Sequence, residues 1–291
     1  MKTDLVAELC ELIHLTSTDL PLAVEGKIRA AADSEVPGSA ALQALETILE
    51  NIRLARQNST PICQDTGTPT FYVHYPRGVE PAAVTRQIHR AVELATAQGT
   101  LRPNAVHALT GINTGSNLGD DYFPLIHFTP TADECLSIDL LLKGGGCENV
   151  SAQYSLPDLS LNAARDLDGV RKVVLDAVHQ AQGYGCAPGF LGVALGGDRA
   201  AGYSAAKEVL LSALDEPNSD ETLSQLEKGL TQDANQLGIG PMGFGGKTTL
   251  LGTRITALHR LPASFFVTVC YMCWAYRRRR LTVSGGQVRY E

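Results

Sequence analysis

Stretches with helical periodicity alternate with strand-like stretches through most of this sequence, and that alternation constrains the fold more than any other feature. Apolar residues recur at helical spacing between 40 and 57, where Ser39 is suited to cap the helix. Residues 70–75 are rich in aromatic and branched side chains and indicate a strand. Pro81 then suits the first turn of another helix. This order predicts an α/β (mixed α+β) fold with mixed sheets flanked by helices.

The second half of the sequence continues the same pattern. Leucine and isoleucine alternate with other residues from Leu136 to Leu142, which indicates a strand that runs into Lys143 and three glycines. The later elements that we expect are helices at 162–181, 199–213 and 220–236, strands at 190–195, 250–258 and 264–272, and a hairpin about Gly285-Gly286. No repeat, low-complexity tract or linker interrupts the pattern, so residues 1–291 are expected to form one structural unit.

Composition excludes some classes of protein. A formal net charge of -7 argues against a general nucleic-acid binder. No apolar run has the length needed to span a bilayer, so we expect no membrane association. The run Arg277-Arg278-Arg279-Arg280 is the exception to the acidic balance, and we interpret it as a solvated surface turn rather than an anion site.

The cysteines indicate a reducing compartment. Seven cysteines, an odd number, occur without an N-terminal charged and apolar leader, so we expect free thiols and a cytoplasmic protein. Cys10, Cys135 and Cys270 lie in apolar helix or strand patterns, where a buried thiol without a chemical role is the usual case. A further cysteine, Cys147, follows the three glycines.

Three other cysteines lie in turns or at a strand end. Cys63 shares a turn of small polar residues with Gln64 and Asp65, Cys186 stands among glycines and a proline, and Cys273 follows an apolar strand. None belongs to a C-x-x-C pair, so a zinc knuckle or a bacterial ferredoxin motif is excluded. Three separated thiolates fit an iron-sulfur cube in which one iron has no protein ligand and can act as a Lewis acid.

Several segments resemble one family, and they occur in the family's order along the chain. The matching segments are Pro61-Ile62-Cys63-Gln64-Asp65-Thr66-Gly67, Leu101-Arg102-Pro103-Asn104-Ala105-Val106, Asn113-Thr114-Gly115, Lys143-Gly144-Gly145-Gly146-Cys147-Glu148-Asn149, Gly185-Cys186-Ala187-Pro188, Leu237-Gly238-Ile239-Gly240-Pro241 and Cys273-Trp274-Ala275. The sequence resembles the alpha subunit of iron-sulfur hydro-lyases of the class I fumarate hydratase and L-tartrate dehydratase type. The resemblance implies one alpha-type catalytic domain over residues 1–291.

The resemblance also implies roles for particular residues. It implies a 4Fe-4S cluster held by Cys63, Cys186 and Cys273, and substrate contacts from the backbone of Gly144, Gly145 and Gly146. Beside a cluster ligand, Asp65 is the candidate acid or base and Gln64 can orient substrate. Arg102 is the candidate for binding a substrate carboxylate, because a guanidinium matches that anion bidentately. Lys143 is either a second positive group or an ordinary strand-end lysine.

The family's substrate site is completed by a swivelling domain, which some members carry on a separate beta subunit. The present sequence ends soon after Cys273, so the resemblance implies half an enzyme that pairs with a beta subunit in an α2β2 heterotetramer. The expected substrate is a small C4 dicarboxylate, either fumarate and malate or L-tartrate and oxaloacetate. Where the family pattern has a histidine ahead of the third cysteine ligand, this sequence has Leu261, with His259 two residues earlier.

Two other functions remain open from the sequence. The run Gly243-Phe244-Gly245-Gly246-Lys247-Thr248 resembles the end of a phosphate-binding P-loop, although Pro241 stands where that motif needs its first glycine. The chain could instead be a non-catalytic structural or metal-binding subunit, whose cysteines have no chemical role or bind zinc.

Overall fold

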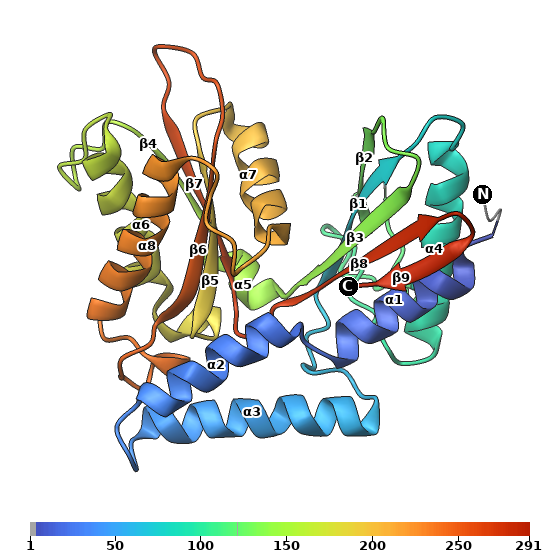
Figure 1. Ribbon diagram of the computed structural model, residues 1–291, viewed down its shortest axis with the longest axis horizontal. Coiled ribbons are helices and arrows are strands. Elements are labelled where there is room, and N and C mark those ends of the chain that lie inside the picture. The colour runs from blue at the N-terminus through green and yellow to red at the C-terminus, as the bar shows by residue number, and fades with distance from the viewer. Residues whose placement is uncertain (1–3, 121) are drawn as a thin grey trace. The chain divides into compact units, whose positions relative to one another are not determined.

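A computed structural model describes residues 4–120 and 122–291, and the described chain forms two compact units. The first unit contains the chain up to Pro21 together with Asn51–Gly145 and Ala275–Glu291. The second contains Leu22–Glu50 and Gly146–Trp274. Each unit has its own mixed sheet with helices packed on it, which confirms the predicted fold class (Figure 1). The expectation that residues 1–291 act as one catalytic domain stays a prediction.

The first unit is built on a five-stranded sheet in the order β2-β1-β3-β8-β9. Strand β1 pairs parallel with β2, and the other pairs in this sheet are antiparallel. Helix α1 packs on β3, β8 and α4, and the leucine, isoleucine and valine side chains between them form the core. The bounds are α1 Val6–Thr18, β1 Thr68–Tyr75, α4 Pro81–Ala97, β2 Leu125–Pro130, β3 Leu136–Lys143, β8 Arg277–Ser284 and β9 Gln287–Tyr290.

Strand register brings three chain segments to one end of this sheet. Thr68, where β1 begins, pairs with Lys143, where β3 ends. Arg277, where β8 begins, pairs with Leu142. The Cys63 turn before β1 and the glycines after β3 therefore lie at the same end of the sheet. The hairpin turn at Gly285-Gly286 lies at the other end, as predicted.

The second unit is built on a four-stranded sheet in the order β4-β7-β5-β6. Helix α7 covers one face of this sheet, and α6 and α8 cover the other (Figure 1). An aspartate caps each of these helices by accepting a backbone N–H, namely Asp166, Asp198 and Asp220. The bounds are α2 Leu22–Ser34, α3 Ala40–Asn58, whose residues up to Glu50 belong here, α5 Gly145–Asn149, β4 Ala152–Ser155, α6 Leu167–Ala181, β5 Gly189–Leu195, α7 Arg199–Glu208, α8 Glu221–Gln236, β6 Leu250–Ala257 and β7 Phe266–Met272.

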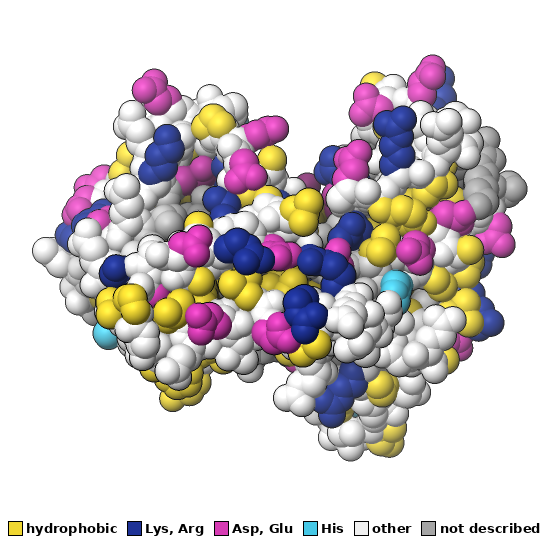
Figure 2. All heavy atoms as spheres, turned by 60° about the horizontal axis from the view of Figure 1, so that its bottom comes forward, with side chains coloured by type: hydrophobic (Ala, Val, Ile, Leu, Met, Phe, Trp, Pro, Cys, Tyr) yellow, Lys and Arg dark blue, Asp and Glu magenta, His cyan; other side chains and the backbone are white. Residues whose placement is uncertain are grey.

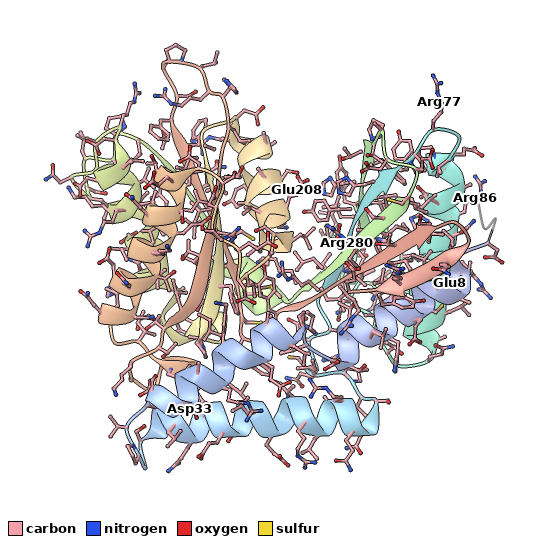
Figure 3. All side chains as sticks on the ribbon, in the orientation of Figure 1. Glu8, Asp33, Arg77, Arg86, Glu208 and Arg280 are labelled. Atoms are coloured by element: carbon pink, nitrogen blue, oxygen red, sulfur yellow. The ribbon has the colours of Figure 1, made fainter. Side chains whose placement is uncertain are left out.

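The elements expected from periodicity are confirmed, and two interpretations of the sequence are wrong. The arginine run is not a surface turn, because it begins β8, the strand from which Arg280 projects in Figure 3. Arg277 is buried, and Arg280 pairs with Asp139 through two hydrogen bonds. Cys135 is half-buried in a bend before β3 rather than buried within a strand. Of the other two thiols that were expected to be buried, Cys270 is buried in β7, but Cys10 is only half-buried in α1.

The helices and the surface charges can be compared with what membrane proteins and nucleic-acid binders require. None of the helices in the described part of the chain combines the length and the apolar character that a membrane span requires. On the face shown in Figure 2, acidic and basic side chains lie next to one another, so their fields partly cancel at short range.

Candidate functional site

The carboxylate of Asp65 is held by two backbone amides at the end of the first sheet. Its Oδ1 accepts a hydrogen bond from the Gly67 N–H at 3.0 Å, and its Oδ2 accepts one from the Gly145 N–H at 2.7 Å. The first of these closes an Asx-type turn, and the second fixes the carboxylate to the glycine loop after β3. Asp65 is half-buried, so its carboxylate is both oriented and accessible.

Two glycines in this region are required by the close approach of neighbouring groups. Gly67 has φ +82°, and a Cβ there would lie 2.9 Å from the backbone of Leu142 and Lys143. A Cβ on Gly144 would lie 3.0 Å from Oδ2 of Asp65. The structure therefore brings Gly144 and Gly145 together with Asp65, as a shared site requires. Lys143 is buried at the end of β3.

Arg102 is connected to the same turn through Thr66. The backbone N–H of Arg102 donates to the Thr66 hydroxyl at 3.0 Å, and the Asn104 side-chain amide contacts that hydroxyl at 3.3 Å. The Arg102 side chain is exposed, as is Gln64, while Cys63 is half-buried. An exposed guanidinium on a segment tied to this turn is available to bind a carboxylate anion.

Cys186 and Cys273 both belong to the second unit, together with Gly146. Cys186 follows the short 3-10 helix Gln182–Gly185 and has left-handed backbone angles, φ 54° and ψ 60°. Its carbonyl accepts a hydrogen bond from the N–H of Trp274 at 3.3 Å, so the loop of Cys186 is tied to the residue next to Cys273. Both cysteines are half-buried.

Tyr271 is the buried side chain around which these cysteines lie. It is 1 % exposed, and its ring fills the space where a Cβ on Gly185 or Gly189 would stand, at 2.6 and 2.5 Å. Burial raises the pKa of Tyr271, and the thiols of Cys273, Cys147 and Cys186 raise it further. Within the described residues its hydroxyl has no hydrogen-bond partner. An unsatisfied donor near several thiols fits a sulfur-rich inorganic group, whose sulfur atoms can accept that hydrogen bond.

The third expected ligand, Cys63, belongs to the first unit, and the seven cysteines, all within the described residues, form no disulfide there. Over residues 4–120 and 122–291, no three His, Cys, Asp or Glu side chains already form a group that could hold a metal ion. The ligand set Cys63, Cys186 and Cys273 therefore stays a prediction.

In the segment that resembles a P-loop, two backbone N–H groups already donate to a carboxylate of the protein. Oε1 of the buried Glu35 accepts hydrogen bonds from the N–H groups of Lys247 and Thr248, at 2.6 and 3.2 Å. The ammonium of Lys247 donates to the Ser34 carbonyl at 2.6 Å. A carboxylate already stands where the motif would bind phosphate, so this loop is not arranged to hold a nucleotide.

Sequence reasoning missed two residues of these sites. Arg277 was included in the arginine run that we interpreted as solvated, although it stands only two residues after Cys273-Trp274-Ala275, where a functional contact could have been expected. Tyr271 precedes Cys273 by two residues but carries no motif of its own.

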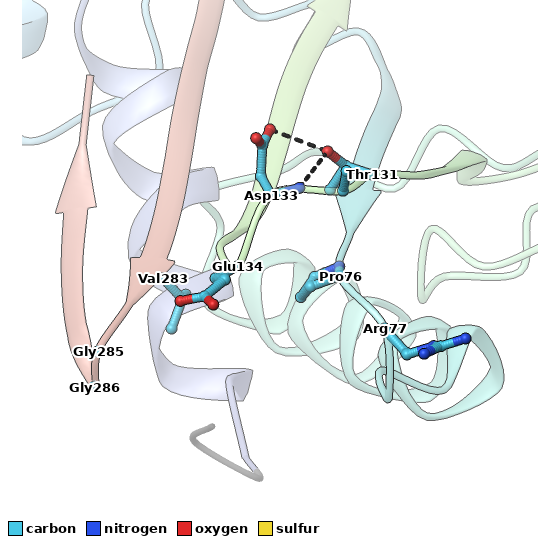
Figure 4. Close-up of a pocket in the computed structure, with 9 residues that line it drawn as sticks. Pro76, Arg77, Thr131, Asp133, Glu134, Val283, Gly285 and Gly286 are labelled. Carbon is cyan, nitrogen blue, oxygen red and sulfur yellow. Dashed lines mark hydrogen bonds between the residues drawn. The ribbon is translucent and has the colours of Figure 1, made fainter.

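A separate cavity of ≈ 620 Å³ lies at the opposite end of the first sheet, beside the Gly285-Gly286 turn (Figure 4). Asp133 in its lining accepts a hydrogen bond from the Thr131 hydroxyl and donates its own N–H to that hydroxyl, at 3.0 and 3.1 Å. None of the candidate catalytic, substrate-binding or metal-binding residues named from the sequence lines this cavity.

Comparison with known proteins shows the family to which the chain belongs. The family model described as Fumarate hydratase (Fumerase) matches residues 6–282. A protein described as a class I fumarate hydratase, from Geobacillus stearothermophilus, is 50% identical over 277 residues, which are 94% of this chain and 54% of that protein. The chain thus spans about half the length of that relative.

Relatives described as L(+)-tartrate dehydratase subunit alpha match over nearly their whole length. The one from Methanocaldococcus jannaschii is 32% identical, with 92% of this chain and 93% of the relative covered. The one from Escherichia coli (strain K12) is 29% identical, with 97% and 90% covered. These matches confirm the resemblance seen in the sequence, and the chain belongs to the fumarate hydratase family, whose named members here are hydro-lyases.

Proposed function

We propose that this chain is the alpha-type catalytic part of a 4Fe-4S-dependent hydro-lyase that acts on a small C4 dicarboxylate. The observation that carries the proposal is the position of the Asp65 carboxylate. Asp65 stands two residues after Cys63, and the amides of Gly67 and Gly145 hold its carboxylate. The chain that contains this arrangement belongs to the fumarate hydratase family. The names of the relatives support two substrate pairs, namely fumarate with malate and L-tartrate with oxaloacetate.

Each of the chain's own site residues would have a separate role in proton transfer or substrate binding. Asp65 moves a proton to or from the carbon next to the one that carries the hydroxyl, because its carboxylate is oriented and reachable. Arg102 binds one substrate carboxylate bidentately. Gln64 and the backbone of the glycine loop, Gly144 to Gly146, contact the remaining oxygens, while the Gly145 N–H itself stays with the Asp65 carboxylate.

Cys63, Cys186 and Cys273 would hold the 4Fe-4S cluster. When bound, its iron without a protein ligand supplies a Lewis acid for the hydroxyl that is added or removed. The unsatisfied hydroxyl of Tyr271 and the tied loops of Cys186 and Cys273 support this choice of cofactor.

A second polypeptide would complete the substrate site. One relative is about twice as long as this chain, and others are named as alpha subunits, which supports a beta partner that carries the swivelling domain in an α2β2 assembly. Seven cysteines that form no disulfide within the described residues support a reducing compartment, the cytoplasm.

The test is anaerobic reconstitution with ferrous iron and sulfide, together with the polypeptide encoded beside this chain. Brown colour with broad visible absorption is expected, and turnover of fumarate, malate or L-tartrate is expected once the partner is added. Replacing Cys63, Cys186 or Cys273 singly with alanine should remove both the absorption and the turnover, whereas Cys135→Ala should remove neither. Full activity after any one of the three changes would refute that ligand, and a colourless protein that binds zinc would refute the cluster.

A further inference from the structure

Arg277 places a buried positive charge directly beside Asp65. Its side chain is 1 % exposed, and its Nη1 donates a hydrogen bond to the backbone carbonyl of Asp65 at 2.8 Å. Among the described residues it takes part in no ion pair, and its Nε has no hydrogen-bond partner. A guanidinium that is buried without an ion pair among the described residues is far from the usual state of arginine.

The register of the first sheet explains how Arg277 reaches this position. It begins β8 opposite Leu142, two residues before Gly144 in the loop that follows β3. A Cβ on Gly144 would lie 3.0 Å from Oδ2 of Asp65 and 3.8 Å from Nη2 of Arg277. The carboxylate and the guanidinium therefore border the same glycine. Asp65 is held at three points, its carbonyl by Arg277 and its two carboxylate oxygens by amides.

Stability alone does not explain this arginine. Burying an unpaired charge is unfavourable, and an apolar side chain of similar volume would pack in that space at lower cost. Arg280, three residues along the same strand, shows the usual arrangement, because it pairs bidentately with Asp139 and its side chain is 45% exposed. The contact that distinguishes Arg277 is the one with the backbone of Asp65.

We infer that Arg277 is a positioning residue, which anchors the main chain of Asp65 so that the carboxylate keeps its place against the glycine loop. This inference rests on the proposed function, in which Asp65 moves the proton. Arg277 acts through Asp65 and does not touch substrate, which separates its role from that of the exposed Arg102.

Kinetics of the reconstituted complex test the role. Arg277→Met should lower kcat by roughly tenfold to a hundredfold, with KM changed by less than about threefold, because a displaced proton carrier affects the reaction more than binding. Arg277→Lys should restore part of the loss, since an ammonium can still donate to the carbonyl. Arg280→Gln, on the same strand, should leave kcat unchanged. Raised KM with unchanged kcat, the pattern expected for Arg102→Gln, would overturn the positioning role.

Hydrogen–deuterium exchange of the complex gives a readout that does not depend on turnover. Amides of residues 61–70 and 143–146 should exchange faster in Arg277→Met and in Arg277→Lys than in the wild type, and not in Arg280→Gln. Unchanged exchange in both Arg277 variants would refute the inference. If Arg277→Met does not fold, the lysine variant decides by both measurements. Wild-type protein without turnover of any tested dicarboxylate would refute the proposed function instead, and the exchange data would still decide the contact.

Discussion

Asp65 is the side chain whose role can be tested with the least change to its surroundings. Asp65→Asn keeps an oxygen for one of the two amides but cannot serve as a base, so kcat is expected to fall by about 10²–10⁴. The visible absorption of the proposed cluster should remain, because the cysteines are untouched. Steady-state rates and absorption spectra of the reconstituted complex provide the measurement.

Asp133→Asn is the matched control for that change. Asp133 also takes part in short-range hydrogen bonds of a turn, but it lies beside the cavity at the other end of the same sheet (Figure 4). Its replacement should leave kcat unaltered. A rate for Asp65→Asn equal to that of the control would remove Asp65 from the reaction.

Site residues could be predicted from the sequence where they are close together along the chain, but not where distant strands bring them together. Asp65 and Gln64 could be proposed because they share one short turn with Cys63, so their proximity is local. The burial of Arg277 follows from the pairing of β8 with β3, and the two strands are far apart in the sequence. A run of four arginines has no helical or strand periodicity that shows which member points inward. The unsatisfied hydroxyl of Tyr271 is likewise a product of packing.

At the scale of elements, the spacing of apolar residues was sufficient to predict the longer helices and strands. The helix that was expected at 40–57 is observed at Ala40–Asn58, and the strand that was expected at 136–142 is observed at Leu136–Lys143. We had no expectation for the short β4, Ala152–Ser155, or for α1, Val6–Thr18. A strand of four residues is too short to show alternation in its sequence, and β4 is recognised as a strand only by its pairing with β7.

The loop that carries Cys186 and the strand β5 that follows it depend on a glycine. A Cβ on Gly189 would lie 2.5 Å from the Cζ and the hydroxyl oxygen of Tyr271. Gly189→Ala should therefore destabilise the protein by roughly 1–3 kcal/mol, which is seen as a lower Tm in thermal unfolding. Gly26→Ala in α2 is the contrast, because nothing lies within 4 Å of its Cβ position and a gain of about 0.5–1 kcal/mol is expected. Equal Tm values for the two variants would contradict this packing.

The loop before α6 should make stability depend on pH. Hydrogen bonds from the Ser160 hydroxyl, the Leu161 N–H and the Ser160 N–H lower the pKa of Asp158. A carboxyl whose pKa is lower in the folded than in the unfolded chain contributes stability above its unfolded value, and that contribution is lost as the pH falls through the folded value.

Denaturant unfolding of wild type and Asp158→Asn across the acid range measures this contribution. The wild type should be the more stable near neutral pH, and the difference between the two should shrink as the pH falls below the ordinary range of aspartate. A difference that stays constant with pH would show that the carboxylate charge has no part in holding this loop.

At the scale of the whole molecule, the chain is expected to need its partner for turnover. Titrating the partner into a fixed amount of the reconstituted chain should raise the rate by roughly a hundredfold or more, because substrate is then held by both polypeptides. The rise should saturate at one partner for each chain. Full turnover without the partner would contradict the division of the site between two polypeptides.

The order of segments in the first unit has a consequence for biosynthesis. Strand β3 leaves the ribosome long before β8, its neighbour in the sheet, because the whole of residues 146–274 is translated in between. During that interval the β8 side of β3 is an open edge on the nascent polypeptide, and such edges invite wrong pairing with other chains. Newly made copies of this protein should therefore depend on chaperones more than their size alone suggests.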